Sequence, residues 1–112
     1  MYMIEELADE GSSFYPTVTF DDELGQSMTP STLFWKLTDP MGNVINSRSA
    51  VTVAVPASSV TIALGGADLE VLGDHVATRI ITLWGTYTSS NHGAGRPFTF
   101  QAQFNIQPRI GG

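Results

Sequence analysis

The chain of 112 residues contains no cysteine, so its fold cannot depend on a disulfide and no thiolate can bind a metal. Charged side chains are also scarce, because Asp, Glu, Lys and Arg make up 14% of the sequence, against about 25% in ordinary soluble domains. Thr, Ser, Gln, Asn and Gly take their place. Such a surface suits dense packing among copies of a protein, where each buried unpaired charge is costly. It is also common in secreted and other β-rich domains.

Basic residues are few, and the net charge of −6 argues against nucleic-acid binding. The first basic residue is Lys36, and after Asp74 only Arg79, Arg96 and Arg109 carry charge. If the acidic and basic parts lie at opposite ends, like subunits could attract one another head to tail. The alternative is a solvated acidic arm with scattered arginines, and we favour it.

Long apolar runs are absent as well. No segment approaches the ~20 apolar residues of a membrane span. The first residues carry Glu5 and Glu6 where a signal peptide requires basic residues. We therefore expect neither a membrane partner nor an export signal.

The clearest pattern that is present runs from Phe98 to Ile106, where every second residue is apolar. This alternation is typical of a half-buried β-strand, because successive side chains point to opposite faces of a sheet. The polar positions between them hold no Lys or Glu, although charge usually protects a free sheet surface. These positions are Thr99, Gln101, Gln103 and Asn105. A neutral hydrogen-bonding face indicates a surface that meets protein.

The pattern in the rest of the chain predicts short strands separated by turns, with the spacing typical of a β-sandwich. The expected strands cover 2–7, 14–20, 33–37, 44–46, 50–55, 59–64, 75–87 and 98–106. We expect a tight turn at 39–43, one helical turn at 67–70, and a flexible loop at 88–97. The expected organisation is an acidic N-terminal arm or edge strand (1–12), one Ig-like domain (13–107) and a short tail (108–112).

The core is predicted from apolar residues that share one phase along their strands. The predicted core residues are Phe14, Val18, Phe20, Leu33, Trp35, Leu37, Val60, Ile62, Leu64, Ile81, Leu83, Phe98, Phe100 and Phe104. Trp84 takes the opposite phase to Ile81 and Leu83, together with Ile80. Either both faces of this strand are covered, or Ile80 and Trp84 form an exposed patch of the kind that marks interaction surfaces. We favour the patch.

Residues with catalytic or metal-binding chemistry are few. His75 and His92 have no acidic residue at a helical ligand spacing, so a metal site with three or four converging ligands is not expected. The run Asp21-Asp22-Glu23 could offer carboxylates to Ca²⁺, but it lacks the EF-hand spacing and is better explained as a solvated loop. No nucleophile elbow or phosphate loop is present. We expect no enzyme activity, no metal and no cofactor.

Three segments resemble a known group of proteins. They are residues 35–48, 58–69 and 79–87, the last followed by a loop and the final strand. From about Gly11 to Ile106 the chain resembles the small Ig-like proteins encoded among the virion structural genes of tailed bacteriophages. The resemblance implies an all-β, antiparallel Ig-like sandwich of about seven strands. It also implies a non-enzymatic capsid decoration, neck or tail accessory protein, with no catalytic residues to transfer.

Two functional classes follow from these observations. The first is a virion protein, assembled in the host cytoplasm and present in several copies, that contacts phage capsid or tail proteins. Its predicted interface is Ile80, Trp84, Thr99, Gln101, Gln103 and Asn105. The second is an Ig-like binding module that recognises carbohydrate or a host surface through loops 21–32 and 88–97.

Overall fold

In the computed structural model, residues 2–4, 8–9, 11–22, 24–70, 77–89 and 91–107 are described. Their secondary structure is β-strand, apart from one 3₁₀ turn, η1 (Gly66–Leu69). The predicted all-β class is therefore confirmed, as is the single helical turn, which begins one residue earlier than expected.

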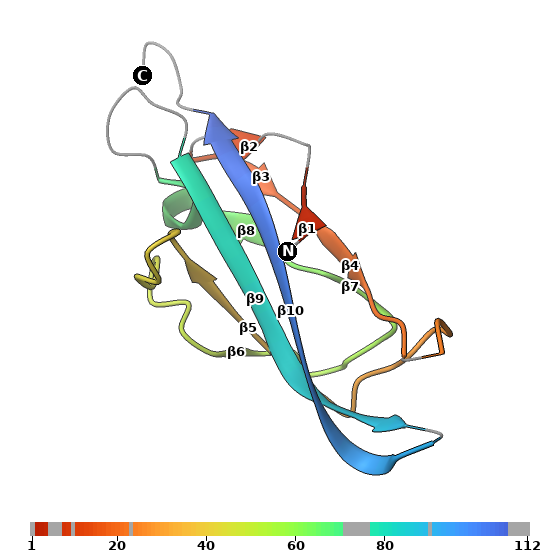
Figure 1. Ribbon diagram of the computed structural model, residues 1–112. Helices are drawn as coiled ribbons and strands as arrows, with labels where there is room; N and C mark the ends of the chain where they lie inside the picture. Colours follow the sequence, from red (N-terminus) through yellow and green to blue (C-terminus); the bar gives the residue numbers. More distant parts are fainter. Residues whose placement is uncertain are drawn as a thin grey trace.

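The main sheet is built around a long hairpin of β9 (Ala77–Ser89) and β10 (Gly93–Gln107) (Figure 1). On the other side of β9 lie β5 (Thr32–Thr38) and the short β6 (Val51–Thr52), both antiparallel to their neighbours. The two hairpin strands have 13 and 15 residues, whereas strands average about 5–6. The tip of the hairpin consequently projects beyond the other strands (Figure 1).

The N-terminal arm lies on the outer edge of β10. Strands β1 (Tyr2–Met3) and β2 (Ala8–Asp9) both pair with β10 in the parallel direction. The sheet is therefore mixed, and the expectation of a purely antiparallel fold was wrong. Alternation of side chains predicts a strand but carries no information about its direction, which explains the error.

Two short antiparallel sheets form a second layer behind the hairpin (Figure 1). One pairs β3 (Ser13–Phe14) with β8 (Leu64–Gly65), and the other pairs β4 (Thr17–Thr19) with β7 (Ser59–Thr61). Pro16 separates β3 from β4, as expected of a residue that cannot donate to a ladder. Aromatic rings join the layers, with centroids 5.0 Å apart for Phe14 and Phe104 and 5.5 Å for Phe20 and Phe98.

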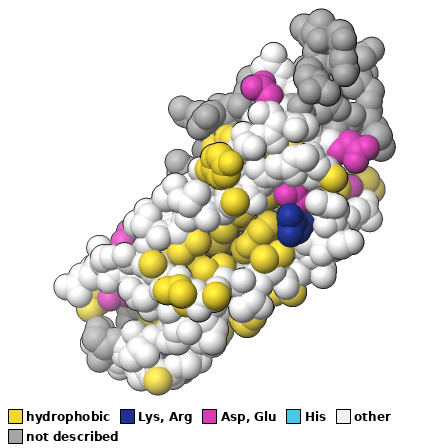
Figure 2. Space-filling model, turned by 180° about the vertical axis from the view of Figure 1, so that it is seen from behind, with side chains coloured by type: hydrophobic (Ala, Val, Ile, Leu, Met, Phe, Trp, Pro, Cys, Tyr) yellow, Lys and Arg dark blue, Asp and Glu magenta, His cyan; other side chains and the backbone are white. Residues whose placement is uncertain are grey.

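The core lies between the two layers. The structure places every predicted core residue in it except Phe98 and Phe100, which are half-buried and pack against its margin. Ala8, Met28, Leu69 and Ile106 are also buried. Seen from behind, exposed hydrophobic side chains also gather in the middle of that face (Figure 2).

Several boundaries differ from those expected. The described residues of the predicted loop 88–97 are mostly strand, because β9 continues to Ser89 and β10 begins at Gly93. Gly93 and Gly95 have positive φ and occupy a register irregularity in the hairpin, so these glycines mark a bulge. Residues 44–46 form no strand, and only a single bridge joins Val44 to Thr38.

Two other predicted strands are shorter or divided. Of residues 50–55, only Val51–Thr52 is strand, and residues 59–64 divide into β7 and β8. His75 and the tail at 108–112 lie outside the described residues, as does part of the arm at 1–12.

Candidate contact face

The register of three strands defines one side of the main sheet. Trp84 lies opposite Thr99 on β10 and opposite Phe34 on β5. The next rows place Thr82 between Gln101 and Lys36, and Ile80 between Gln103 and Thr38. We call this side the outer face. Its residues are Phe34, Lys36, Thr38, Thr78, Ile80, Thr82, Trp84, Thr99, Gln101, Gln103 and Asn105.

All six residues predicted to form an interface lie on this outer face. Thr99 and Gln101 are exposed, and the remaining four are half-buried. The second layer of strands lies on the opposite side of the sheet (Figure 1). The outer face is therefore open to a partner at its exposed and half-buried positions.

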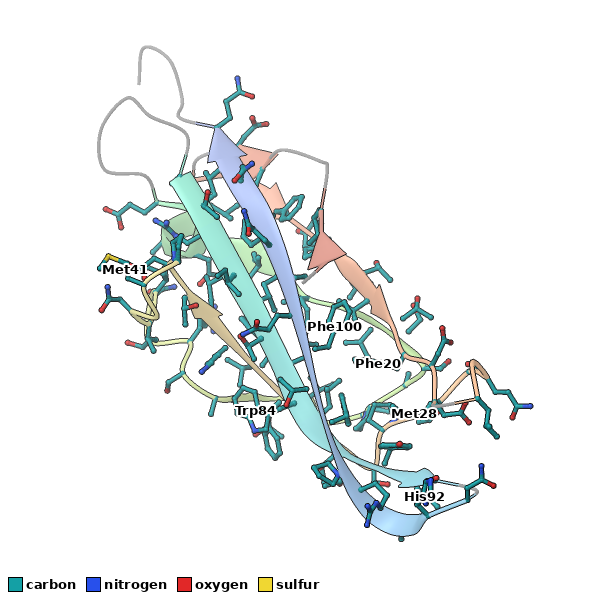
Figure 3. All side chains as sticks on the ribbon, viewed as in Figure 1. Phe20, Met28, Met41, Trp84, His92 and Phe100 are labelled. Atoms are coloured by element: carbon teal, nitrogen blue, oxygen red, sulfur yellow. The ribbon has the colours of Figure 1, made fainter. Side chains whose placement is uncertain are left out.

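An aromatic pair lies at one end of this face. The rings of Phe34 and Trp84 stack with 5.8 Å between centroids and 29° between planes, and Trp84 is labelled in Figure 3. Phe34 was missing from the predicted interface. It takes the opposite phase to Leu33 and Trp35, so the same pattern that singled out Trp84 could have identified it.

Hydrogen bonds between neighbouring strands hold the polar side chains of the face in place. Gln101 Nε2 donates to Thr82 Oγ1 at 3.3 Å, and Thr78 Oγ1 donates to Asn105 Oδ1 at 2.9 Å. Because these hydrogen bonds already restrict the side-chain rotamers, less conformational entropy is lost when a partner binds. Their amides and hydroxyls can still exchange water for groups of a partner at small net cost.

Lys36 carries the only formal charge on the outer face. An aromatic pair next to neutral hydrogen-bonding groups has the composition of a protein interface, where aromatic residues are enriched and charged residues are depleted. The arrangement is suited to binding by contact.

A buried ion pair lies elsewhere in the described part of the chain, and it was not predicted from the sequence. Asp68 in η1 is 1% exposed and accepts hydrogen bonds from Arg48 Nε at 3.0 Å and Asn46 Nδ2 at 2.9 Å. Burial raises the pKa of this carboxyl, but hydrogen bonds from Arg48, Asn46 and the Gly65 amide outweigh burial and lower it overall. The Arg48 guanidinium also lies 5.8 Å from the ring centroid of Trp35. These contacts tie a turn to η1, so the cluster is structural.

The other residues considered for chemistry are accounted for locally. Asp22 Oδ1 accepts the backbone N–H groups of Leu24 and Gln26, which fixes a turn. The backbone N–H of His92 donates to Ser89 Oγ in the hairpin turn. In the described part of the chain, no group of three or more His, Asp or Glu residues could hold a metal. Glu23 and His75 lie outside that part.

Comparisons with protein-family models, curated proteins and solved structures gave no match to this chain. Among the described residues, no helix has the length and apolar character needed to cross a membrane.

Proposed function

We propose that this protein is a non-enzymatic structural component of a tailed-phage virion, and that it attaches to capsid or tail proteins through its outer face. The observation that carries the proposal is the strand register. It places Phe34 and Trp84 on the same open sheet face as the amide side chains of β10, which are Gln101, Gln103 and Asn105. Interfaces that are rich in aromatics and poor in charge at their centre have this composition.

We further infer that the fold is a variant of the Ig-like sandwich. Two layers enclose a core that contains Trp35, and the last two strands form a hairpin. The parallel pairing of β1 and β2 is a departure from the antiparallel pattern expected.

A role as a loop-based binding module receives less support. One of its two loops, residues 88–97, is mostly strand, and the other is closed by a bridge between Asp21 and Ser27. The outer face, in contrast, is assembled from three strands and needs no loop.

The experiment that tests the proposal is quantitative mass spectrometry of purified virions from the phage whose genome encodes the chain. If the protein is a structural component, each particle should contain a fixed number of copies. That number should not change after a salt wash and a density gradient. Absence of the protein from such particles, while it is present in the infected-cell extract, would contradict the proposal.

A further inference from the structure

The outer edge of β10 is covered over only part of its length. Strand β1 pairs at Ala102 and Gln103, and β2 pairs at Ile106 and Gln107. Within the part of the chain that the structure describes, no strand pairs with this edge between Gly93 and Gln101. An open edge of this length presents backbone groups on which another strand can form a ladder.

The direction of these backbone groups follows from one hydrogen bond. The Ile4 N–H donates to the Gln103 carbonyl at 2.8 Å, so the backbone groups of Gln103 point to the outer edge. Because alternate residues of an antiparallel pair point to opposite edges, those of Thr99 and Gln101 point the same way. Pro97 shares this phase and has no N–H, in keeping with a proline at a sheet edge.

A trough runs beside this edge, between β10 and β4. One hollow of about 260 Å³ is lined by Ile4, Val18, Phe100 and Ala102, among others. A second hollow, of about 360 Å³, is lined by Phe20, Phe98 and Phe100 together with their neighbours. The two hollows share Thr19 and Phe100 in their linings, so they lie next to each other along the edge.

The trough explains why Phe98 and Phe100 are only half-buried. Their side chains lie on the inward side of β10 and line the hollows, and within the described residues no strand pairs with the edge beside them. Among the described residues that line the two hollows, Asp21 alone carries a charge. An occupant must therefore supply a backbone to the edge, apolar side chains to the trough and little negative charge.

We propose that the open edge of β10 binds an extended, neutral segment of a partner protein as an added β-strand. The backbone of this segment pairs with Thr99 and Gln101. Its side chains at two alternate positions enter the trough beside Phe98 and Phe100. Strands β1 and β2 already show that this edge accepts added strands. The site differs from the outer face, and the inference stands or falls independently of the virion role.

The probe is a neutral, blocked seven-residue peptide of alternating threonine and valine between terminal glutamines. Amide hydrogen exchange of the full-length protein is followed by NMR with and without the peptide. The Thr99 and Gln101 amides should exchange quickly in the free protein and about tenfold more slowly at saturating peptide. Amides on the β9 side of β10 are the internal reference.

Two N-methylated peptides provide the matched control and require no variant of the protein. One carries N-methyl groups on its threonines and the other on its valines, so only one of the two blocks the edge that faces β10. Strand addition predicts that one peptide still slows exchange and the other does not. The proposal would be overturned if the two peptides behaved equally. It would also be overturned if the Thr99 and Gln101 amides were already protected in the free protein, or if the unmethylated peptide never protected them.

Discussion

Trp84 stacks on Phe34 of the neighbouring strand, at the side of the main sheet that faces away from the second layer. The two residues lie directly opposite each other in the strand register, and their contact joins β9 to β5. Cross-strand aromatic pairs contribute about 0.5–1.5 kcal/mol beyond the burial of their area. An interaction of that size stabilises the sheet but is not essential for folding, so the pair can be altered to test a role in binding.

The first prediction concerns the core. Trp35 is buried between the layers and pairs with Leu83. Trp35→Ala should lower the free energy of unfolding by about 3–5 kcal/mol, the usual loss for a large buried aromatic. Urea denaturation followed by circular dichroism measures this change. A loss below about 1 kcal/mol would be incompatible with the central position of Trp35.

The second prediction concerns Asp68. Asp68→Asn should lower the free energy of unfolding at pH 7 by about 2–3 kcal/mol, because charge-assisted hydrogen bonds from Arg48 and Asn46 are weakened. The exposed Asp21 provides the control variant, Asp21→Asn, which should change stability little.

The pH dependence of the same pair has a defined sign. Because the pKa of Asp68 is lowered on folding, its carboxylate stabilises the native state above the unfolded pKa, and this contribution is lost as pH falls through the folded pKa. Wild-type stability should therefore decrease as pH falls below about 4. Asp68→Asn should show a smaller decrease over this range. Parallel pH profiles for the two proteins would argue against a linked carboxylate.

The third prediction concerns Gly85, where β9 and β5 approach closely. A Cβ atom at this position would lie 2.0 Å from the backbone oxygen of Thr32. Gly85→Ala must move backbone and should reduce stability by about 3 kcal/mol, at the upper end for overpacking.

Gly42→Ala is the control for Gly85→Ala, and both proteins are compared by thermal denaturation. Gly42 has φ +91° and no atom within 4 Å of an added Cβ, so only conformational strain of about 1–2 kcal/mol applies. Equal losses for the two variants would contradict the close approach of β5 to Gly85.

The fourth prediction concerns the N-terminal arm. From the sequence we predicted that a neighbouring subunit orders residues 1–10, with an edge strand of the same domain as the alternative. The structure places β1 and β2 on β10 of the same chain, with Ala8 2% exposed and Ile4 against the core. Deleting residues 1–9 should therefore destabilise the isolated protein by about 2 kcal/mol. A truncated protein with unchanged denaturant midpoint would instead favour ordering of the arm by a neighbour.

The sequence predicted much of the fold because alternation is a local signal. The pattern from Phe98 to Ile106 placed Gln101 and Trp84 on one face once β9 and β10 were assumed to pair. The direction of β1 could not be predicted in this way. The prediction of a loop at 88–97 was wrong because a segment rich in glycine is typical of loops. In the structure, Gly93 and Gly95 form a bulge in the hairpin.

Contacts between distant residues were the other features that the sequence did not reveal. Asp68 and Arg48 are 20 residues apart, and no spacing rule links a 3₁₀ turn to a connecting loop. The close approach at Gly85 likewise depends on where β5 begins relative to β9. Such features are properties of packing, and a strand pattern does not determine them.

The central claim, attachment through the outer face, is tested most directly by counting copies bound to purified particles that lack the protein. Trp84→Ala removes one ring of the aromatic pair, and Gln101→Lys adds a charge to the outer face. The control, Tyr15→Ala, alters an aromatic residue that is 62% exposed and lies outside the outer face. All three should fold, as circular dichroism will show. We expect wild-type occupancy for Tyr15→Ala and at least about tenfold weaker binding for the other two. Wild-type occupancy for both outer-face variants would contradict the central claim.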